Sequence, residues 1–379
     1  IKKSLNSVGI SIDWSREFST GDNVYQKFIE WQFEKLNQAG ILTQGKYPIL
    51  YSPQDQNAVG EDDIKDGDSD KVSIQEMTFI KFRDTQSDQF FVAATLRPDS
   101  LFGATNLYIK PDMDLVKVDV DQQIWIVAQA AVVKLQHQFD HVNVLSQHKG
   151  EEFKDNSVIV PLTDKQVPIY MAEFPSENHG TGIVYSSPAD SPHDYIHLFE
   201  NKFPGQTLDQ YKESDPLKLT PITKTYDKNK NIIQYKSNIP AYHTLLEFGI
   251  YQSNGNDEKL EEAKQHLYKQ AHYGAIMINC REFDGTPVKH GQQKTTQALI
   301  DKHLGGIFYE TSRRAITRAG NQVIVAQLDQ QWFLDYSKPE IKQKAFDLLD
   351  KMTYNPAKMK STQKTYLEWV QMRPCARKR

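Results

Sequence analysis

The stretch GTGIVYSSPADSPHDY, residues 180–195, runs from two glycines through an apolar pair into a polar segment with two prolines. The apolar pair predicts the end of a buried strand, which the turn-forming residues after it must break. Ser191 and Pro192 are typical of a helix start, and YIHLF supplies apolar spacing behind them. Asp194 is therefore expected near the first turn of a helix, where a carboxylate suits a substrate amine and equally a plain capping role.

A second stretch, ATLRPDSLFGATN at residues 94–106, has a similar layout. An apolar strand ends in hydroxyl and charged side chains, and a glycine follows that permits close approach of the backbone. Two such strand ends, rich in hydroxyls and backbone amides, can together frame a small polar pocket. A threonine-rich turn is also typical of a satisfied capping network, so this pattern alone leaves both interpretations open.

Composition limits the class of protein. At 379 residues, with 39% apolar and 25% charged content, the chain can bury a sizeable core in two or three domains. Its net charge of −4 argues against binding of nucleic acid over the whole surface. The segment from Lys338 to Arg379 is nevertheless basic, with eleven Lys and Arg against four Asp and Glu, and it suits phosphate groups or a solvated face.

Targeting signals and cysteines point to one cellular setting. No apolar run approaches the ~18 residues that cross a bilayer, so no membrane contact is expected. The chain begins with IKKSL, without Met or an apolar signal, and we expect a piece of a longer protein. Cys280 and Cys375 are too far apart for a zinc site or a disulfide framework, which favours a cytoplasmic location.

The acidic stretch GEDDIKDGDSD, residues 60–70, begins like a calcium-binding loop, because Asp66, Asp68 and Asp70 alternate. Such a loop needs a glutamate where this chain has Met77, and it also lacks the required glycine. An acidic linker is therefore the favoured interpretation.

Periodicity predicts helices and strands along the chain. Residues 23–42 place aromatic and apolar side chains at helical spacing, Gly40 closes that helix, and the aromatic side chains are expected in a core. The helix predicted over 256–274 has one apolar face, composed of Leu260, Ala263, Leu267 and Ala271. The other elements predicted are strands in 73–84, 88–97 and 321–328, and helices in 332–352 and 364–372.

The two stretches together resemble a known family. TLRPDSLFGAT, followed about eighty residues later by GTGIVYSSPADSPHDY, resembles the inserted editing domain of leucyl-tRNA synthetases of the archaeal and eukaryotic cytosolic type. The resemblance continues through LEEAKQHLYKQAHYGAIMI, RRAITRAGNQVIVA and DQQWFLDYS, and it covers nearly the whole chain. Isoleucyl and valyl enzymes carry related insertions, but YSSPADSPHDY fits the leucyl pattern better.

The resemblance implies a mixed α/β fold. Residues 74–326 would be a β-rich editing domain with a barrel-like core and surrounding helices. Residues 1–73 and 327–379 would be flanking pieces of a Rossmann-type catalytic domain. The chain has no HIGH sequence, and KMKS at Lys358 is interpreted as a chance match to KMSKS. ATP and Mg²⁺ would therefore serve the parent synthetase and not this piece, and editing itself would need no cofactor.

The resemblance also implies a site that accepts the 3′ terminal adenosine of mischarged tRNA(Leu) and hydrolyses the aminoacyl ester. Asp194 would bind the substrate α-amino group, and Thr95 would lie near the reacting ester. The other residues implied in substrate binding are Leu96, Arg97, Ser100, Ile183, Val184, Tyr185, Ser187, Ser191 and His193. Ser100 stands where the family usually has a threonine that blocks leucine, so leucine exclusion is expected to weaken unless Leu101, Phe102 or Tyr185 fills the space.

The residue types near the two stretches narrow the mechanism. No metal-ligand cluster and no Ser-His-Asp or Cys-His set is evident, which favours hydrolysis by a positioned water. Two alternatives stay open. One is an isoleucyl or valyl editing insertion, and the other is a tRNA-docking module with an inactive pocket.

Overall fold

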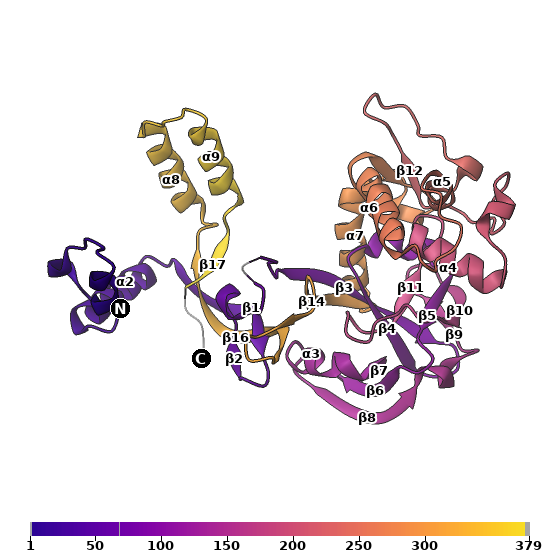
Figure 1. Cartoon of the computed structure of the whole chain (residues 1–379), viewed down its shortest axis with the longest axis horizontal. Helices are drawn as coiled ribbons and strands as arrows, with labels where there is room; N and C mark the ends of the chain where they lie inside the picture. Colours follow the sequence, from indigo (N-terminus) through magenta and orange to yellow (C-terminus); the bar gives the residue numbers. More distant parts are fainter. Residues whose placement is uncertain (1, 68, 376–379) are drawn as a thin grey trace. The chain divides into compact units, whose positions relative to one another are not determined.

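The strand pair predicted within residues 73–97 is confirmed as β3 (Ile74–Asp84) and β4 (Gln89–Thr95), which are antiparallel. The structure is a computed structural model that describes residues 2–67 and 69–375 (Figure 1). Strand β3 is buried continuously from residue 77 to residue 82, a segment in which Thr78 and Lys81 stand among four apolar residues. Such a run is typical of a strand covered on both faces.

Strands β3 and β4 lie within a sheet of ten strands in the order β11-β5-β10-β9-β3-β4-β7-β6-β8, with β14 also paired to β3. The other strands of this sheet are β5 (Asn106–Ile109), β6 (Asp114–Val120), β7 (Gln123–Ala128), β8 (Val142–Lys149), β9 (Ser157–Val160), β10 (Lys165–Met171), β11 (Val184–Ser186) and β14 (Gly305–Thr311).

The expectation of a barrel-like core is wrong in one respect, because the paired strands form no closed ring among the described residues. The long strand β3 pairs with β14 along residues 74–80 and with β9 only at Arg83 and Asp84. The sheet therefore branches at β3. The mixed α/β class and the β-rich middle of the chain are confirmed.

Helices cover this sheet and enclose a separate core. One face of the sheet packs against the 3₁₀ helix η3 (Pro98–Gly103) and against α7 (Val288–Asp301) through Leu101, Phe102, Val288 and Leu299. The separate core lies among α4 (Pro192–Lys202), α5 (Pro240–Glu247) and α6 (Asp257–Gly274). The buried residues of α6 are Leu260, Ala263, Leu267 and Ala271, which confirms the predicted face.

The chain divides into two compact units, Ile1–Tyr47 with Leu328–Arg379, and Pro48–Gln327. Strands β1 (Leu42–Ser52) and β16 (Gln322–Asp335) pass from one unit into the other. The remaining helices and strands are α1 (Lys2–Ser7), β2 (Asn57–Ala58), α3 (Val132–Gln136), β12 (Thr223–Thr225), β13 (Ala275–Met277), β15 (Ala315–Ile316), α8 (Pro339–Lys351), α9 (Met359–Trp369) and β17 (Met372–Pro374), with short 3₁₀ turns between some of them. The domain limits predicted from the sequence stay a prediction.

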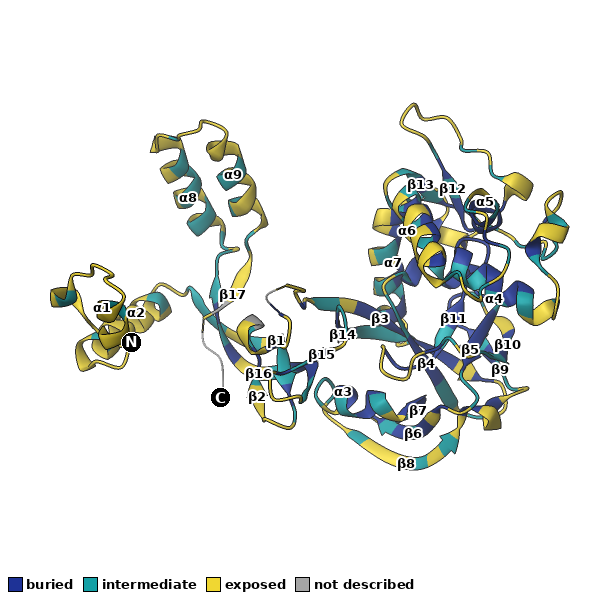
Figure 2. Cartoon of the chain, viewed as in Figure 1, coloured by how far each residue is buried: buried dark blue, intermediate teal, exposed yellow. Residues whose placement is uncertain are grey.

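Helix α2 (Asn23–Gln38) confirms the first predicted helix, and Gly40 ends it with a φ of +62°. The prediction that its aromatic side chains belong to a core is wrong, because α2 has no buried residue (Figure 2). Trp31, for example, is 53% exposed. Periodicity predicts a helix with an apolar stripe. It does not supply a surface to cover that stripe.

The prediction of a helix from residue 332 is wrong at its start. Strand β16 continues to Asp335, where it pairs with β17, and helix α8 begins only at Pro339. The apolar WFLD sequence suits a strand or a helix, and pairing with a segment about forty residues away decides the outcome. In the part of the chain that the structure describes, no helix has the length and apolar character needed to span a bilayer.

Of the acidic stretch, Asp68 lies outside the described residues, and Asp70 forms an ion pair with Arg313 at 2.7 Å.

Candidate functional site

The turn formed by residues 180–182, called the GTG turn below, depends on both of its glycines. Gly180 and Gly182 have φ values of +56° and +83°, which side chains disfavour. A Cβ on Gly182 would lie 2.5 Å from the Cβ of Ala128, so the backbone approaches β7 closely there. The prediction that Ile183 and Val184 end a strand is wrong, because the short strand β11 begins at Val184 and Ile183 precedes it.

Asp194 lies in the first turn of α4, as predicted. The Ser191 hydroxyl caps the helix by accepting a hydrogen bond from the Asp194 amide at 3.4 Å, and Pro192 opens the helix. The Asp194 carboxylate accepts a hydrogen bond from the Ser187 amide at 2.7 Å and is 15% exposed. The carboxylate therefore links the end of β11 to the start of α4, and this link goes beyond helix capping.

The second stretch places Arg97 beside Asp99. The Arg97 guanidinium donates two-pronged hydrogen bonds to the Asp99 carboxylate, the shortest at 2.7 Å, and it lies 4.8 Å from the centre of the Tyr268 ring. Burial opposes the charge of Arg97, but Asp99 outweighs it and raises the pKa of Arg97. The Thr95 hydroxyl, at the end of β4, accepts a hydrogen bond from the Arg97 amide at 2.9 Å.

The structure brings residues from the two stretches into direct contact. The Tyr185 hydroxyl donates to the Arg97 carbonyl at 2.8 Å and lies 2.7 Å from the Ser100 hydroxyl. The Ser100 hydroxyl donates to the same carbonyl at 2.7 Å. Burial raises the pKa of Tyr185, so its phenol stays protonated near neutral pH. The tyrosine hydroxyl thus lies beside Ser100, which joins the two stretches through their side chains.

Close approach of the two stretches also depends on Gly103. A Cβ on Gly103 would clash with the Ser187 hydroxyl, so any other residue there would require the Ser187 side chain to move. The sequence contained a glycine at this position, but only the fold identifies its neighbour.

Tyr268 in α6 is a residue that the sequence analysis missed. Burial and then the charge of Asp194 raise its pKa to about 12, while its ring lies against the Arg97 guanidinium. Tyr268 therefore lies within electrostatic reach of both stretches. No local motif marks it, because it sits beside Leu267 in an ordinary amphipathic helix.

His193 and the next turn of α4 form an aromatic cluster with Phe174. The ring of His193 lies 4.8 Å from Phe174 and 4.5 Å from His197, and its Nδ1 is 3.8 Å from the Asp194 carboxylate. Burial, and then His193, lower the pKa of His197 to about 4, so His197 is neutral at physiological pH.

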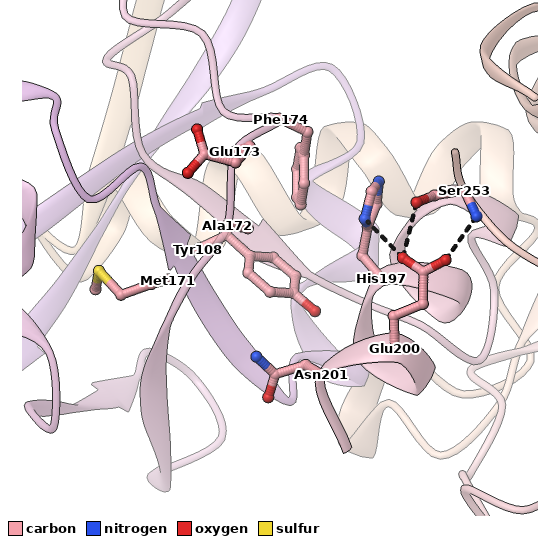
Figure 3. Close-up of a pocket in the computed structure, with 9 residues that line it drawn as sticks. All are labelled: Tyr108, Met171, Ala172, Glu173, Phe174, His197, Glu200, Asn201 and Ser253. Carbon is pink, nitrogen blue, oxygen red and sulfur yellow. Dashed lines mark hydrogen bonds and ion pairs between the residues drawn. The ribbon is translucent and has the colours of Figure 1, made fainter. Parts of the chain in front are cut away.

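A cavity of about 440 Å³ adjoins this cluster (Figure 3). Its lining residues are Tyr108, Met171, Ala172, Glu173, Phe174, His197, Glu200, Asn201 and Ser253. The Glu200 carboxylate accepts hydrogen bonds from the amide and the hydroxyl of Ser253 at 2.6 and 2.7 Å. None of the site residues predicted from the sequence lines this cavity, although Val184 pairs with Tyr108 across β11 and β5.

The other predicted residues have different surroundings. Leu96 is 49% exposed, whereas Ile183 and Ser187 are buried. Among residues 2–67 and 69–375, no group of three or more His, Cys, Asp or Glu side chains is arranged to hold a metal ion.

Comparison with known proteins gives the family. Residues 1–375 match the family described as tRNA synthetases class I (I, L, M and V). The whole chain is 38% identical to the leucine–tRNA ligase of Thermoplasma volcanium and 37% identical to that of Thermoplasma acidophilum, and it spans 38% of the length of each. More than three fifths of the chain resembles the editing domains of the cytosolic leucyl-tRNA synthetases of P. knowlesi and P. falciparum. For P. knowlesi, the match covers 63% of this chain and 97% of the domain, with a TM-score of 0.51 and 16% identity. For P. falciparum, it covers 62% of this chain and 99% of the domain, with a TM-score of 0.50 and 17% identity. At that identity the likeness shows the fold alone.

Proposed function

The chain belongs to the class I tRNA synthetases (I, L, M and V), and from that premise we propose that it edits mischarged tRNA(Leu). Its substrate would be the 3′ end of tRNA(Leu) carrying isoleucine, norvaline or methionine. Water would attack the ester carbonyl, the bond to the ribose oxygen would break, and the products would be a free amino acid and an uncharged tRNA. Support comes from the leucine–tRNA ligase relatives and from the editing-domain fold.

The observation that carries the proposal is the position of the Asp194 carboxylate. One of its oxygens accepts the Ser187 amide, and the group remains partly exposed at the start of α4. A substrate ammonium bound there would pair with a carboxylate that the fold already orients. We assign Asp194 the role of anchoring the amino group.

Thr95 has the role of orienting the ester or the attacking water. Its side chain has hydrogen bonds with the Arg97 amide and with Tyr185, which hold the Thr95 hydroxyl in place at the end of β4. Positioning of this kind accounts for hydrolysis without a strong protein base, and the ribose hydroxyl beside the ester assists. Because the Arg97 guanidinium is paired with the Asp99 carboxylate, we assign Arg97 to stabilising the turn after β4 and not to binding a substrate phosphate.

Two further parts of the proposal concern the setting of the reaction. Hydrolysis would use no cofactor, whereas ATP and Mg²⁺ would belong to leucine attachment by the longer synthetase. The remainder of that synthetase would be the partner of this chain, and the reaction would take place in the cytoplasm.

The experiment that tests the proposal is deacylation of preformed aminoacyl-tRNA. We expect the chain to release isoleucine, norvaline and methionine from tRNA(Leu) much faster than leucine. Preferential hydrolysis of valyl or threonyl esters, each on the tRNA of another amino acid, would instead favour an isoleucyl or valyl editing insertion. Binding of isoleucyl-tRNA(Leu) without hydrolysis would contradict the proposal and indicate a docking module.

A further inference from the structure

Lys134 and Glu310 form an ion pair in the interior of the unit Pro48–Gln327. The Lys134 ammonium, from α3, lies 2.6 Å from the Glu310 carboxylate of β14, 176 residues away. The two residues are only 1% and 4% exposed. Neither residue belongs to the stretches that define the candidate site.

The pair binds the backbone of the GTG turn on both sides of one residue. The Lys134 ammonium donates to the carbonyls of Gly180 at 2.7 Å and Asn178 at 3.3 Å, so all of its three donors are used. The Glu310 carboxylate accepts a hydrogen bond from the Gly180 amide at 3.0 Å. Gly180 is therefore held through its N–H by the anion and through its C=O by the cation.

Stability alone does not explain such a pair. Removing two charges from water is costly, and an apolar pair of similar volume is often as stable in a protein interior. What an apolar pair lacks is the ability to hold a particular peptide group in one position. The pair thus confers a fixed backbone geometry at Gly180, where φ is +56°.

The position of Gly180 determines where the site residues of β11 lie. The chain continues from Gly180 to Thr181, whose carbonyl accepts a hydrogen bond from the Ala128 amide at 2.8 Å. It enters β11 at Val184. Tyr185 then contacts Ser100, and the Ser187 amide holds Asp194. A displacement at Gly180 would be passed along this short segment to the site.

We propose that the Lys134–Glu310 pair is a positioning device for the candidate site, acting through the backbone of Gly180 and touching no substrate. The activity readout of this inference rests on the proposed editing function. The structural readout does not depend on that function.

The test is a double variant, Lys134→Met with Glu310→Met, which removes both charges together and leaves no unpaired ion in the interior. The matched control is Lys81→Met. Lys81 is also a buried lysine, 6% exposed, but it donates to the Gln123 side chain at 2.8 Å and not to the GTG turn. Both proteins are compared with wild type by thermal unfolding, hydrogen exchange of the Gly180 amide and steady-state deacylation of isoleucyl-tRNA(Leu).

We expect the folded double variant to exchange the Gly180 amide faster and to lose about tenfold or more in kcat, with KM changed much less. Lys81→Met should keep wild-type kcat and wild-type exchange at Gly180. A folded double variant with wild-type exchange and wild-type kcat would overturn the inference. So would a loss of kcat in the control as large as in the double variant, because activity would then follow general damage to the interior.

Two other results are also decisive. If the double variant does not fold, Lys134→Arg keeps the charge but changes the donor geometry at Gly180, and unchanged kcat in that protein would overturn the inference. If the wild-type chain hydrolyses no ester, the proposed function fails, and faster exchange of the Gly180 amide in the double variant still supports the positioning role.

Discussion

Helices α6 and α2 both have an apolar face, but only that of α6 is buried. In α6, the whole apolar face is buried: Leu260, Ala263 and Leu267 lie in the core shared with α4 and α5, and Ala271 lies in the core of the ten-stranded sheet. In α2, the aromatic stripe remains exposed, with no buried residue in the helix. Periodicity therefore sets which face of a helix is apolar, whereas burial requires a complementary surface. The unit Pro48–Gln327 supplies that surface from its own residues, and it also contains the candidate site.

The largest expected effect tests whether the chemistry depends on one carboxylate of that unit. Asp194→Ala would leave the substrate ammonium unpaired, at a cost of about 2–5 kcal/mol, so deacylation of isoleucyl-tRNA(Leu) should fall by orders of magnitude. The control is Asp257→Ala, which removes a carboxylate from the first turn of α6. We expect that change to leave deacylation intact. Near wild-type hydrolysis by a folded Asp194→Ala protein would refute the assigned role.

The next prediction tests the contrast between the two helices directly. Leu267→Ala should lower the free energy of unfolding by about 2–5 kcal/mol, because it opens a cavity in the core of α4, α5 and α6. Trp31→Ala should change it by no more than about 0.5 kcal/mol, because Trp31 is 53% exposed. Urea unfolding monitored by circular dichroism measures both values. Equal losses would show that α2 is packed in solution as firmly as α6.

A third prediction concerns selectivity at the contact between Ser100 and Tyr185. Ser100→Ala removes the hydroxyl that lies 2.7 Å from the Tyr185 hydroxyl, which should let leucine enter. Hydrolysis of leucyl-tRNA(Leu) should then rise by up to the ~10–200-fold that one small group discriminates, while isoleucyl-tRNA(Leu) changes much less. Ser100→Thr is the opposite control and should keep leucyl-tRNA(Leu) intact. If leucyl hydrolysis stays at background in the alanine variant, another residue, such as His193, excludes leucine.

The last two predictions compare the two units by the pH dependence of their stability. Burial raises the pKa of Asp190 from 3.8 to about 6, so between these two pH values the folded protein holds this proton more tightly than the unfolded chain does. Its stabilising contribution is complete below about pH 4 and is lost as the pH rises through 6, up to about 3 kcal/mol. Asp190→Asn should therefore become more stable relative to wild type between pH 4 and 7 in urea unfolding. A difference that is independent of pH would contradict this explanation.

Asp335, in the other unit, provides the comparison for that pH series. Its pKa is lowered by hydrogen bonds from Ser337, the side-chain bond having the larger effect. Its contribution is therefore present above its usual pKa and lost as the pH falls, which is the opposite trend. The difference in free energy of unfolding between Asp335→Asn and wild type should therefore shrink as the pH is lowered toward 3. A gap that widens on acidification would show that the Ser337 contacts do not form in solution.

Features that depend on neighbours along the chain could be predicted from the sequence. Ser191 and Pro192 start α4 and place Asp194 in its first turn, because capping involves residues within one turn. The apolar face of α6 and the pairing of β3 with β4 follow from local periodicity and a short connection. These features include the strand ends and the carboxylate on which the proposed function depends.

Features whose partners are distant in the chain depend on how the strands and helices pack. Strand β16 continues to Asp335 because β17 pairs with it, and the Arg97 guanidinium lies against the ring of Tyr268 from α6. The hold of Lys134 and Glu310 on Gly180 joins residues 46 and 130 positions apart. A lone lysine or glutamate in a sequence carries no sign of such a role, because its burial and its partners exist only after the strands and helices have packed.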